Sequence, residues 1–414
     1  MINNFQLNLD SIKNISLEEK RIREKKLMLF NDVGFPSKKF EEWKFTDLNK
    51  IITDNFKELT VATNIKNNEN INLINDFEHN FLIIKNGILE KINLKYEDEE
   101  KVKVDNYEYD LIDNDKSSNP LINLNNALFQ SGYSLKVHQN YKLNRPLVIY
   151  NLFSGNLDNK IINNKNSIKL ENNSQVELVE LNFDNSSYKF IQNSYTNISI
   201  GKESSLINYS IQGNKSNGFF YKFVKSILSE KSNYEDYIFS SGLKFNKIEE
   251  EIDINGDEAK CNIQSAIFLE LDEHNEIKTL VNHFKPNCNS YQKIKNVLSD
   301  KCKGAYQGKI FVRDIAQKTD AYQLSKALLL KDTSEFNTKP ELEIYADDVK
   351  CSHGSTSGSV NEDSIYYLMT RGLNRKSAIA LLTKAFLFEV INSISNIDIK
   401  KFIEKNLDRQ IYGH

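Results

Sequence analysis

A cysteine and a histidine two positions apart are the residues best suited to chemistry in this 414-residue sequence. They are Cys351 and His353, in a segment that reads ADDVKCSHGSTSGSVNEDSIYYLMTRG. The run LEIYA precedes the segment, so we predict that Asp347–His353 is the end of a β-strand. Strand alternation then places four side chains on one face: Asp347, Val349, Cys351 and His353. At a rise of about 3.3 Å per residue, the Cα atoms of Cys351 and His353 would lie about 6.5 Å apart, so both side chains could face one thiophilic metal.

These two side chains do not make a complete metal site. Tetrahedral iron or zinc takes about four ligands, or three with an open position, so the other ligands must come from elsewhere. The alternative is a structural role, in which Cys351 is a buried strand residue and His353 is a hydrogen-bonded turn residue. The residues alone leave both interpretations open.

The glycine- and serine-rich run HGSTSG carries no enzyme motif. It contains neither GK[ST] nor GxGxxG, and we expect it to lie between a strand end and a short helix. The hydroxyl residues Ser355–Ser357 do not form a GxSxG elbow. No catalytic serine is therefore assigned, and the chain is not predicted to be an enzyme.

The remaining cysteines and histidines show no ligand spacing. Four cysteines without a CxxC pair are typical of a reducing compartment and exclude a closed zinc site from local spacing. Three of them are expected to be small core residues: Cys261, Cys288 and Cys302. The other histidines lack HExxH or any paired spacing and are expected to be structural: His79, His138, His274, His283 and His414.

Composition narrows the classes of partner. A net charge of -3, from 54 basic and 57 acidic residues, gives no field that would gather nucleic acid or anionic lipid. The most apolar stretch, AIALLTKAFLFEVI, is interrupted by Lys384 and Glu389 and is too short to span a bilayer. The N-terminus MINNFQLNLDSIKN does not read as a secretory signal, so a cytoplasmic location is expected.

Residues 1–120 are predicted to form a mixed α/β region. Ser16 and Glu19 resemble a capping box, and Gly34 ends the predicted helix. Its expected apolar stripe consists of Leu17, Ile22, Leu27 and Phe30. The only tryptophan, Trp43, follows within KKFEEWKFTDL, and short strands such as NFLIIKNGIL come next.

Residues 121–360 are predicted to be mainly β. Polar turns start at Glu171, Gly201, Ser229 and Asn255, at spacings of 30, 28 and 26 residues, with strand-length runs between them. A repeat of this length is typical of a solenoid, in which each unit buries its apolar face against the next. An antiparallel meander or sandwich would also place polar turns between strands, so the pattern alone leaves both folds open.

Residues 361–414 are predicted to be helical. Asn361 can cap one helix that ends at Gly372, and Asn374 can cap a second, RKSAIALLTKAFLFEVINSI. A third, IDIKKFIEKNL, is more polar. Because the second helix is apolar around most of its circumference, we expect it to be deeply packed or to lie against a partner.

Two of these motifs carry a resemblance to a known family. ADDVKCSHGSTSG, followed by a short helix ending in Arg371-Gly372, is similar to the C-terminal signature of the SufB/SufD family of the SUF iron–sulfur cluster assembly system. EEWKFTDL around Trp43 resembles an N-terminal motif of its SufD branch. The SufB branch is the poorer match, since AQKTDAYQLSKALLL has no cysteine and acidic residues do not flank His353.

The resemblance implies a fold and a set of partners. The fold would be a right-handed parallel β-helix core, flanked by the α/β N-terminal region and the C-terminal helices. The partners would be a SufB-like paralogue, forming a heterodimer, and a SufC-like ABC ATPase that docks on the C-terminal helices. Candidate docking residues are Tyr366, Tyr367, Arg371, Leu382 and Phe386. A homodimer of the isolated chain is left open.

The resemblance also implies roles for the opening residues. His353 would help to hold iron or a transient iron–sulfur cluster at the SufB interface, with ligands from SufB, and Cys351 is the weaker candidate. No cofactor is expected in the isolated chain. The remaining alternatives are a SufB-like scaffold, a zinc-binding structural protein, and a β-helix enzyme acting on polysaccharide or acyl groups.

Overall fold

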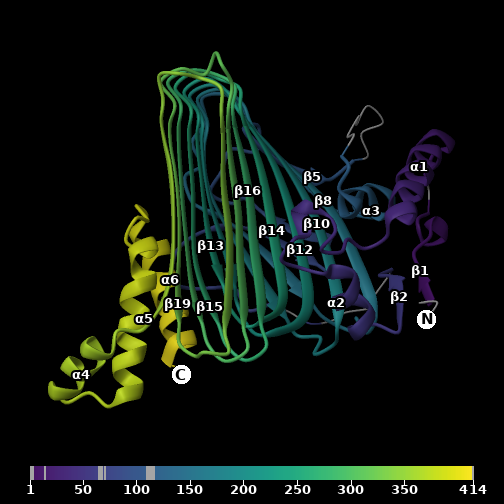
Figure 1. Ribbon diagram of the computed structural model, residues 1–414. Coiled ribbons are helices and arrows are strands. Elements are labelled where there is room, and N and C mark those ends of the chain that lie inside the picture. Colours follow the sequence, from purple (N-terminus) through teal and green to yellow (C-terminus); the bar gives the residue numbers. More distant parts are fainter. Residues whose placement is uncertain (1–3, 14, 64–68, 70, 109–116, 413–414) are drawn as a thin grey trace.

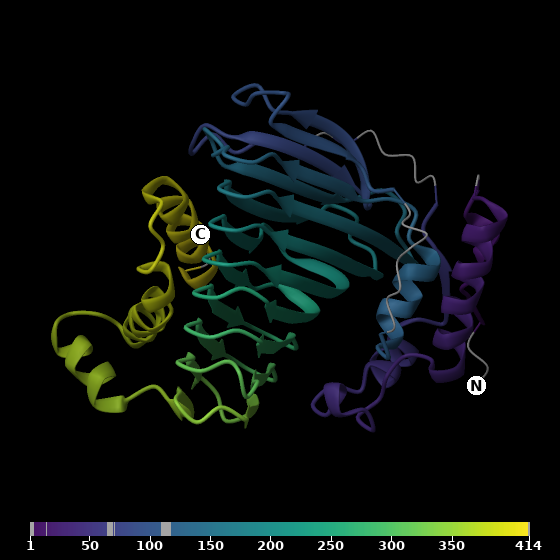
Figure 2. The same cartoon turned by 90° about the horizontal axis from the view of Figure 1, so that it is seen from above.

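The centre of the molecule is a parallel β-solenoid of about 8 turns (Figure 1). The computed structural model describes residues 4–13, 15–63, 69, 71–108 and 117–412. Successive strands alternate between two sheets, and each strand pairs in parallel with the strand one turn later. The turns stack in chain order, from the N-terminal side to the yellow-green final turn (Figure 2). The parallel β-helix is thus confirmed, and the meander is excluded.

The two sheets have a simple strand order. The first contains β1 (Asn4–Gln6), β2 (Glu58–Val61), β8 (Lys160–Leu170), β10 (Phe190–Ile200), β12 (Ser216–Leu228), β14 (Leu243–Ile254), β16 (His274–His283), β18 (Lys303–Val312) and β20 (Glu335–Ile344), with β6 (Tyr133–Val137) on β8 and β5 (Val102–Asn106) on β6. The second contains β4 (Ile88–Asn93), β3 (Asn80–Lys85), β7 (Leu147–Phe153), β9 (Gln175–Asp184), β11 (Ser205–Gln212), β13 (Asn233–Ser240), β15 (Lys260–Leu269), β17 (Asn289–Leu298), β19 (Asp320–Leu329) and β21 (Lys350–Ser359).

One corner of the solenoid is built from the polar turns that the sequence predicted. Each turn contains a residue in the left-handed region, with φ between 54° and 59°: Asn173, Glu203, Lys231, Glu258, Asn287 and Lys318. Only local reversals of this kind let the chain pass from one sheet to the other within a few residues. The turns at Glu171, Gly201, Ser229 and Asn255 are therefore confirmed, and the same corner continues for two further turns.

The N-terminal region packs on the outside of the first sheet. Its helices are η1 (Leu9–Ser11), α1 (Leu17–Val33), η2 (Glu41–Trp43), α2 (Leu48–Asn55) and α3 (Pro120–Leu128). The Ser16 hydroxyl accepts a hydrogen bond from the Glu19 backbone N–H, and Gly34 ends α1 with φ 72°, as predicted. The predicted strand run NFLIIKNGIL forms the β3–β4 hairpin, which turns at Asn86-Gly87.

The predicted apolar stripe of α1 is only partly right. Phe30 is buried, but Leu17 is 81% exposed, and Arg23 is buried instead. The guanidinium of Arg23 bonds to Glu19 and to the backbone carbonyl oxygens of Ala127 and Phe129, each at 2.8–2.9 Å. These carbonyls belong to the end of α3, so the face of α1 that points inward is set by a contact distant in sequence.

The three C-terminal helices are α4 (Glu362–Thr370), α5 (Arg375–Ile391) and α6 (Ile397–Tyr412). Two of them, α5 and α6, pack on the outside of the second sheet, and α4 contacts α5 (Figure 2). Asn361 and Asn374 cap α4 and α5 as predicted, each accepting a backbone hydrogen bond at 2.9 Å. Helix α5 lies against β15 and β17, so its apolar circumference is explained in part by packing within the chain. Among the described residues, no helix is long and apolar enough to cross a membrane.

Candidate functional site at the open end of the solenoid

The solenoid ends in two edge strands. Within the described part of the chain, β20 is the last strand of the first sheet, and β21 is the last strand of the second. Interior side chains of this final turn are only half-buried, including Phe336 and Leu342, because no further turn covers them. We call this surface, formed by β20 and β21, the open end.

Strand β21 differs from the sequence prediction in its position. It begins at Lys350 and runs to Ser359, whereas Asp347 and Asp348 lie in the preceding bend. The HGSTSG run is therefore a strand and not a connection, and His353 is a strand residue and not a turn residue. Pairing with β19 explains the difference, because residues 350–359 match residues 320–329 in continuous register.

The free edge of β21 exposes a defined set of backbone groups. The Lys350 N–H donates to the Thr319 carbonyl at 2.9 Å, on the β19 side. Alternate residues of a parallel strand bond to opposite sides, so the outward N–H and C=O groups belong to Cys351, His353, Ser355 and Ser357. The strand has no proline and only one lysine to block pairing, and such an edge is a template for another chain.

Cys351 and His353 lie on the same side of β21, as predicted. Their register partners Ala321 and Gln323 are both buried inside the solenoid, so the two side chains point toward its axis at the open end. Cys351 is half-buried against a small apolar cluster, and burial raises the pKa of its thiol. His353 is exposed. One ligand candidate is thus half-buried, and the other is exposed at the uncovered end of the solenoid.

The ligand set is incomplete within this chain. Among the described residues there is no group of three or more histidine, cysteine, aspartate or glutamate side chains that could hold a metal ion. Cys351 and His353 therefore have no third protein ligand here. An imidazole and a thiol on an exposed edge strand are suited to a site that a second chain completes.

The candidate docking residues fall into two groups. On α4, Tyr366 and Tyr367 are 71% and 56% exposed, and Arg371 lies 5.3 Å over the ring of Tyr367. On α5, Leu382 and Phe386 are half-buried. Lys295 Nζ lies 4.3 Å from the ring centre of Phe386 and donates to its backbone carbonyl at 2.8 Å. Helix α4, which projects from the body in Figure 1, is thus the freer surface.

The other cysteines and histidines occupy structural positions. The three remaining cysteines belong to the interior apolar cluster, and burial raises the pKa of each thiol. Burial lowers the pKa of His274 and of His283 to about 4. His79 and His138 are hydrogen-bonded to Tyr150 and Glu171. His414 lies outside the described residues.

A buried charged network holds the Trp43 motif on the first sheet, and sequence reasoning missed it. The Lys247 ammonium lies 4.1 Å from the Trp43 ring centre and donates to the Glu42 carbonyl at 2.7 Å. It also pairs with the Glu276 carboxylate at 2.5 Å, with both side chains fully buried. Thr46 donates to the same carboxylate. An acidic residue in a strand 29 positions after a lysine gave no local signal of this pairing.

Fold and site together define a class of protein. The molecule is a parallel β-solenoid whose open end presents Cys351 and His353 beside free backbone groups of β21. A family model described as "SUF system FeS cluster assembly, SufBD core domain" matches residues 153–386, which is more than half of the chain. The chain belongs to the SufBD family.

Individual relatives place the chain on the SufD side of that family. It is 24% identical over 390 residues to the iron-sulfur cluster assembly protein SufD of Escherichia coli, covering 92% of this chain and 90% of the relative. It is 26% identical over 395 residues to the SufBD family protein slr0076 of Synechocystis, covering 88% and 85%. A match to SufD of Bacillus subtilis is 29% identical over 133 residues, 32% of this chain and 30% of the relative. The chain is a SufD-type family member.

Proposed function

We propose that this chain is a scaffold subunit of a SufB–SufC–SufD complex and supplies one side of the place where iron enters and an iron–sulfur cluster is assembled. The observation that carries the proposal is the half-built ligand pair, Cys351 and His353, on the free edge strand of the open end. The cluster is cargo in this account. The chain turns over no substrate of its own, and it works in the cytoplasm.

His353 is the stronger ligand in this proposal. Its exposed imidazole can reach a metal held by a second chain, and its backbone groups point toward that chain. Cys351 has a raised thiol pKa and needs a metal or a nearby cation to become a thiolate. It therefore acts after His353 has engaged the iron, or only shapes the site.

The SufB-type partner is proposed to continue the solenoid at the open end. Strands β20 and β21 offer main-chain hydrogen bonds, and the half-buried side chains between them offer apolar surface. Pairing there buries both, which gives affinity, while matching side chains give register. In the absence of that partner, a second copy of this chain is the natural competitor for the same edges.

The SufC-type ATPase is proposed to dock on the C-terminal helices. Tyr366, Tyr367 and Arg371 form an exposed aromatic and cationic group on α4, and such residues are enriched at binding hot spots. Leu382 and Phe386 on α5 extend that surface toward the solenoid. Substituting a charged residue for Tyr366 and Tyr367 tests this contact without disturbing the fold. The same substitution at Phe386 would also remove its packing against Lys295.

The site proposal is tested by co-expressing the chain with SufB-type and SufC-type proteins and measuring iron and sulfide under anaerobic conditions. His353→Ala is expected to leave the complex assembled but to lower its iron and sulfide content. The matched control is His138→Ala, which removes a half-exposed histidine paired with Glu171, remote from the open end. Unchanged iron and sulfide in the His353 variant would refute the site.

The docking proposal has its own test. Tyr366→Glu combined with Tyr367→Glu is expected to abolish co-purification of the ATPase while the SufB-type partner is retained. Tyr188→Glu is a suitable control, since Tyr188 is 41% exposed in a loop between β9 and β10. Continued co-purification of the ATPase with the α4 variant would remove these residues from the interface.

A further inference from the structure

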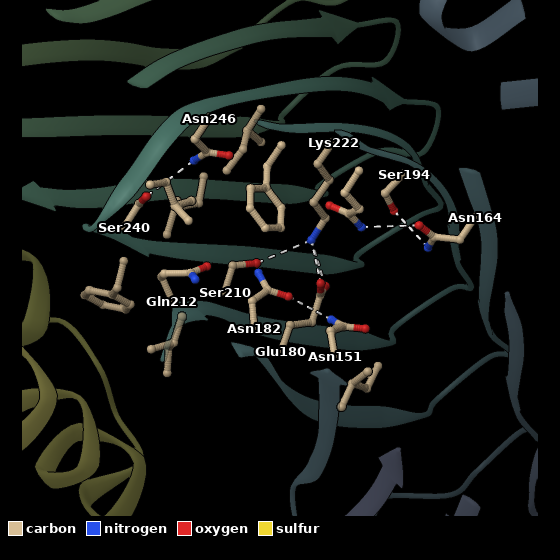
Figure 3. Close-up of a pocket in the computed structure, with 18 of the residues that line it drawn as sticks. Asn151, Asn164, Glu180, Asn182, Ser194, Ser210, Gln212, Lys222, Ser240 and Asn246 are labelled. Carbon is tan, nitrogen blue, oxygen red and sulfur yellow. Dashed lines mark hydrogen bonds and ion pairs between the residues drawn. The ribbon is translucent and has the colours of Figure 1, made fainter. Parts of the chain in front are cut away.

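The interior of the solenoid contains a row of buried polar side chains that the proposed function does not use. Figure 3 shows the part of this row around Lys222, whose ammonium points toward Glu180 and Ser210. Lys222 Nζ bonds to both Glu180 carboxylate oxygens at 2.7 and 2.9 Å. An internal cavity of ≈ 50 Å³ lies beside these groups, which is room for ordered water.

Two buried carboxyl groups, those of Asp236 and Glu250, lie next to this ion pair and face each other. Asp236 and Glu250 are each 2% exposed, and burial raises the pKa of both. Asn208 donates to Asp236 at 2.7 Å, but neither Glu250 oxygen has a hydrogen-bond donor among the described residues. A single proton held between the two carboxyls supplies the missing hydrogen bond and removes one buried charge.

A register column leads from Asp236 to the open end. Asp236, Ile263, Gln292, Gln323 and His353 are consecutive partners in neighbouring strands of the second sheet. Neighbouring strands lie about 4.8 Å apart, so the column covers roughly 19 Å along the solenoid axis. Its last two members are Gln323, buried on β19, and His353, exposed on the edge strand β21.

Hydroxyl groups fill the middle of this span. Thr279 is the register partner of Glu250 in the next strand of the first sheet. Its hydroxyl donates to the Gln292 side-chain oxygen at 2.5 Å and lies 3.1 Å from the Tyr306 hydroxyl. The Tyr306 hydroxyl lies 2.9 Å from the same Gln292 oxygen. Rotating hydroxyls can pass a proton by exchanging donor and acceptor roles.

Gly308 brings the next polar group within reach. A Cβ at this position would lie 2.2 Å from the Tyr306 hydroxyl oxygen and 2.8 Å from the Gln323 side-chain oxygen. The Tyr306 hydroxyl and the Gln323 side chain therefore share the space beside Gly308, which the side chain of any other residue would fill. Gln323 is fully buried, and neither of its side-chain polar atoms has a partner among the described residues.

The groups without partners mark two joints in the row. One joint is at Glu250, before Thr279, and the other is at Gln323, before the open end. A buried polar atom left without a hydrogen bond costs on the order of 1–3 kcal/mol, and ordered water is the usual remedy. We propose that water at these joints completes a proton path from the Asp236–Glu250 pair along the solenoid axis to the open end.

The path moves protons and nothing else. When a proton leaves the carboxyl pair, the O–H bond of the carboxyl breaks and a new O–H bond forms on a neighbouring water. The waters and hydroxyls of the path then pass a proton outward in the same way, with no oxidation or reduction. The charged and titratable groups facing the pair are Glu180 from β9, Lys222 from β12, Tyr234 from β13 and Cys261 from β15. Lys222 remains paired with Glu180, so the acid pair is the group that exchanges. This inference stands without the proposed function, since it needs neither metal nor partner.

Infrared spectroscopy of the full chain tests the path through the C=O stretch of a protonated carboxyl. The wild type is expected to show this band at neutral pH, and Glu250→Gln should lower its intensity, leaving the part that comes from Glu273, whose pKa burial raises to about 7. On transfer to heavy water the wild-type band should shift within the mixing time. Tyr306→Phe and Gln323→Leu should each slow that shift by about tenfold or more, because exchange then waits for local opening of the fold.

Tyr209→Phe is the matched control. Tyr209 is also a fully buried tyrosine whose hydroxyl has no partner among the described residues, but it faces the C-terminal helices outside the sheet. It should exchange like the wild type. A missing band, a band that Glu250→Gln leaves unchanged, or equal exchange in the wild type and Gln323→Leu would each overturn the path. Gln323→Leu replaces an unpaired buried amide, so it decides the question even if Tyr306→Phe does not fold.

Discussion

The two ends of the solenoid are finished in opposite ways. On the N-terminal side, β4 and β5 run antiparallel to their neighbours β3 and β6, and both carry charged residues such as Lys91 and Asp105. At the C-terminal side, the parallel order simply stops at β20 and β21. Reversed, charged strands discourage further pairing, whereas a bare parallel edge invites it. The chain therefore ends in reversed strands on one side and in unpaired parallel strands on the other.

The N-terminal region is held on the first sheet through buried charge on β14 and β16, whereas its charged contact with β20 at the open end is not buried. Lys247 and Glu276 hold η2 and Thr46 against the first sheet, as described above. At the open end, the ion pairs of Lys339 with Glu41 and Glu341 are partly exposed. Exposed pairs contribute little to stability, and losing one partner of a buried pair is costly.

Removing Glu276 should produce the largest change. In Glu276→Ala the Lys247 ammonium stays buried with only Glu249, 3.6 Å away, as a counter-charge, so we expect a loss of about 3 kcal/mol in the free energy of unfolding, measured by urea denaturation. The control is Glu341→Ala at the open end, which should cost about 1 kcal/mol or less. Equal losses in the two variants would contradict the asymmetry.

Proline in β21 should separate the inner and outer backbone groups of the open end. Thr356 bonds toward β19, so Thr356→Pro is expected to cost about 3 kcal/mol in unfolding free energy. Ser357 points its N–H outward, so Ser357→Pro should cost less than about 1 kcal/mol and instead prevent association with the SufB-type partner. Native complex formation by Ser357→Pro, seen by size-exclusion chromatography, would argue against pairing at this edge.

Two buried histidines should make the free energy of unfolding depend on pH. Burial lowers the pKa of His283 to about 4, from 6.5 when unfolded, so the folded state binds fewer protons. His283 alone should thus lower the free energy of unfolding by about 3 kcal/mol as the pH drops from 6.5 to 4. His283→Gln should remove about half of the whole fall, because burial lowers the pKa of His274 to about 4 as well. Urea denaturation across that range measures the fall in the wild type and in the variant.

The smallest expected effect is a difference in thiol reactivity between Cys351 and the other three cysteines. In the native chain, Cys351 is expected to react slowly with a maleimide, and the other three cysteines, which are 0–3% exposed, should react only after unfolding. Mass spectrometry then counts one label in the native state and four in denaturant. Partner binding at the open end should protect Cys351. A labelled Cys288 in the native state would show that the interior is more open than its packing implies.

The sequence predicted the parts of the fold that depend on local chemistry. The corner turns at Glu171 and Gly201 and the caps at Ser16, Asn361 and Asn374 follow from short-range preferences that packing did not override. The end of β21 was predicted at His353 instead of Ser359 because glycine and serine in HGSTSG are typical of loops, and only the distant strand β19 makes them a strand. Context across strands decided that segment.

The buried charges were beyond sequence prediction for the same reason. Lys222 and Glu180 are 42 residues apart, and Lys247 and Glu276 are 29 apart, so no local pattern announces either pair. The candidate site was half visible: spacing placed Cys351 and His353 on one face, but their position at an uncovered end depended on where the solenoid stops. Where the stack of solenoid turns stops depends on all the turns together, and no single local motif predicts it.

Helix α5 has a further consequence for the mechanics of the molecule. Each turn of the solenoid is hydrogen-bonded only to its neighbours, so a force applied along the axis would peel strands away one at a time, beginning at β21. Helix α5 lies across β15 and β17 and is pinned by the Lys295–Glu389 ion pair. It therefore acts as a brace behind β15 and β17, so peeling should slow once β21 and β19 have detached.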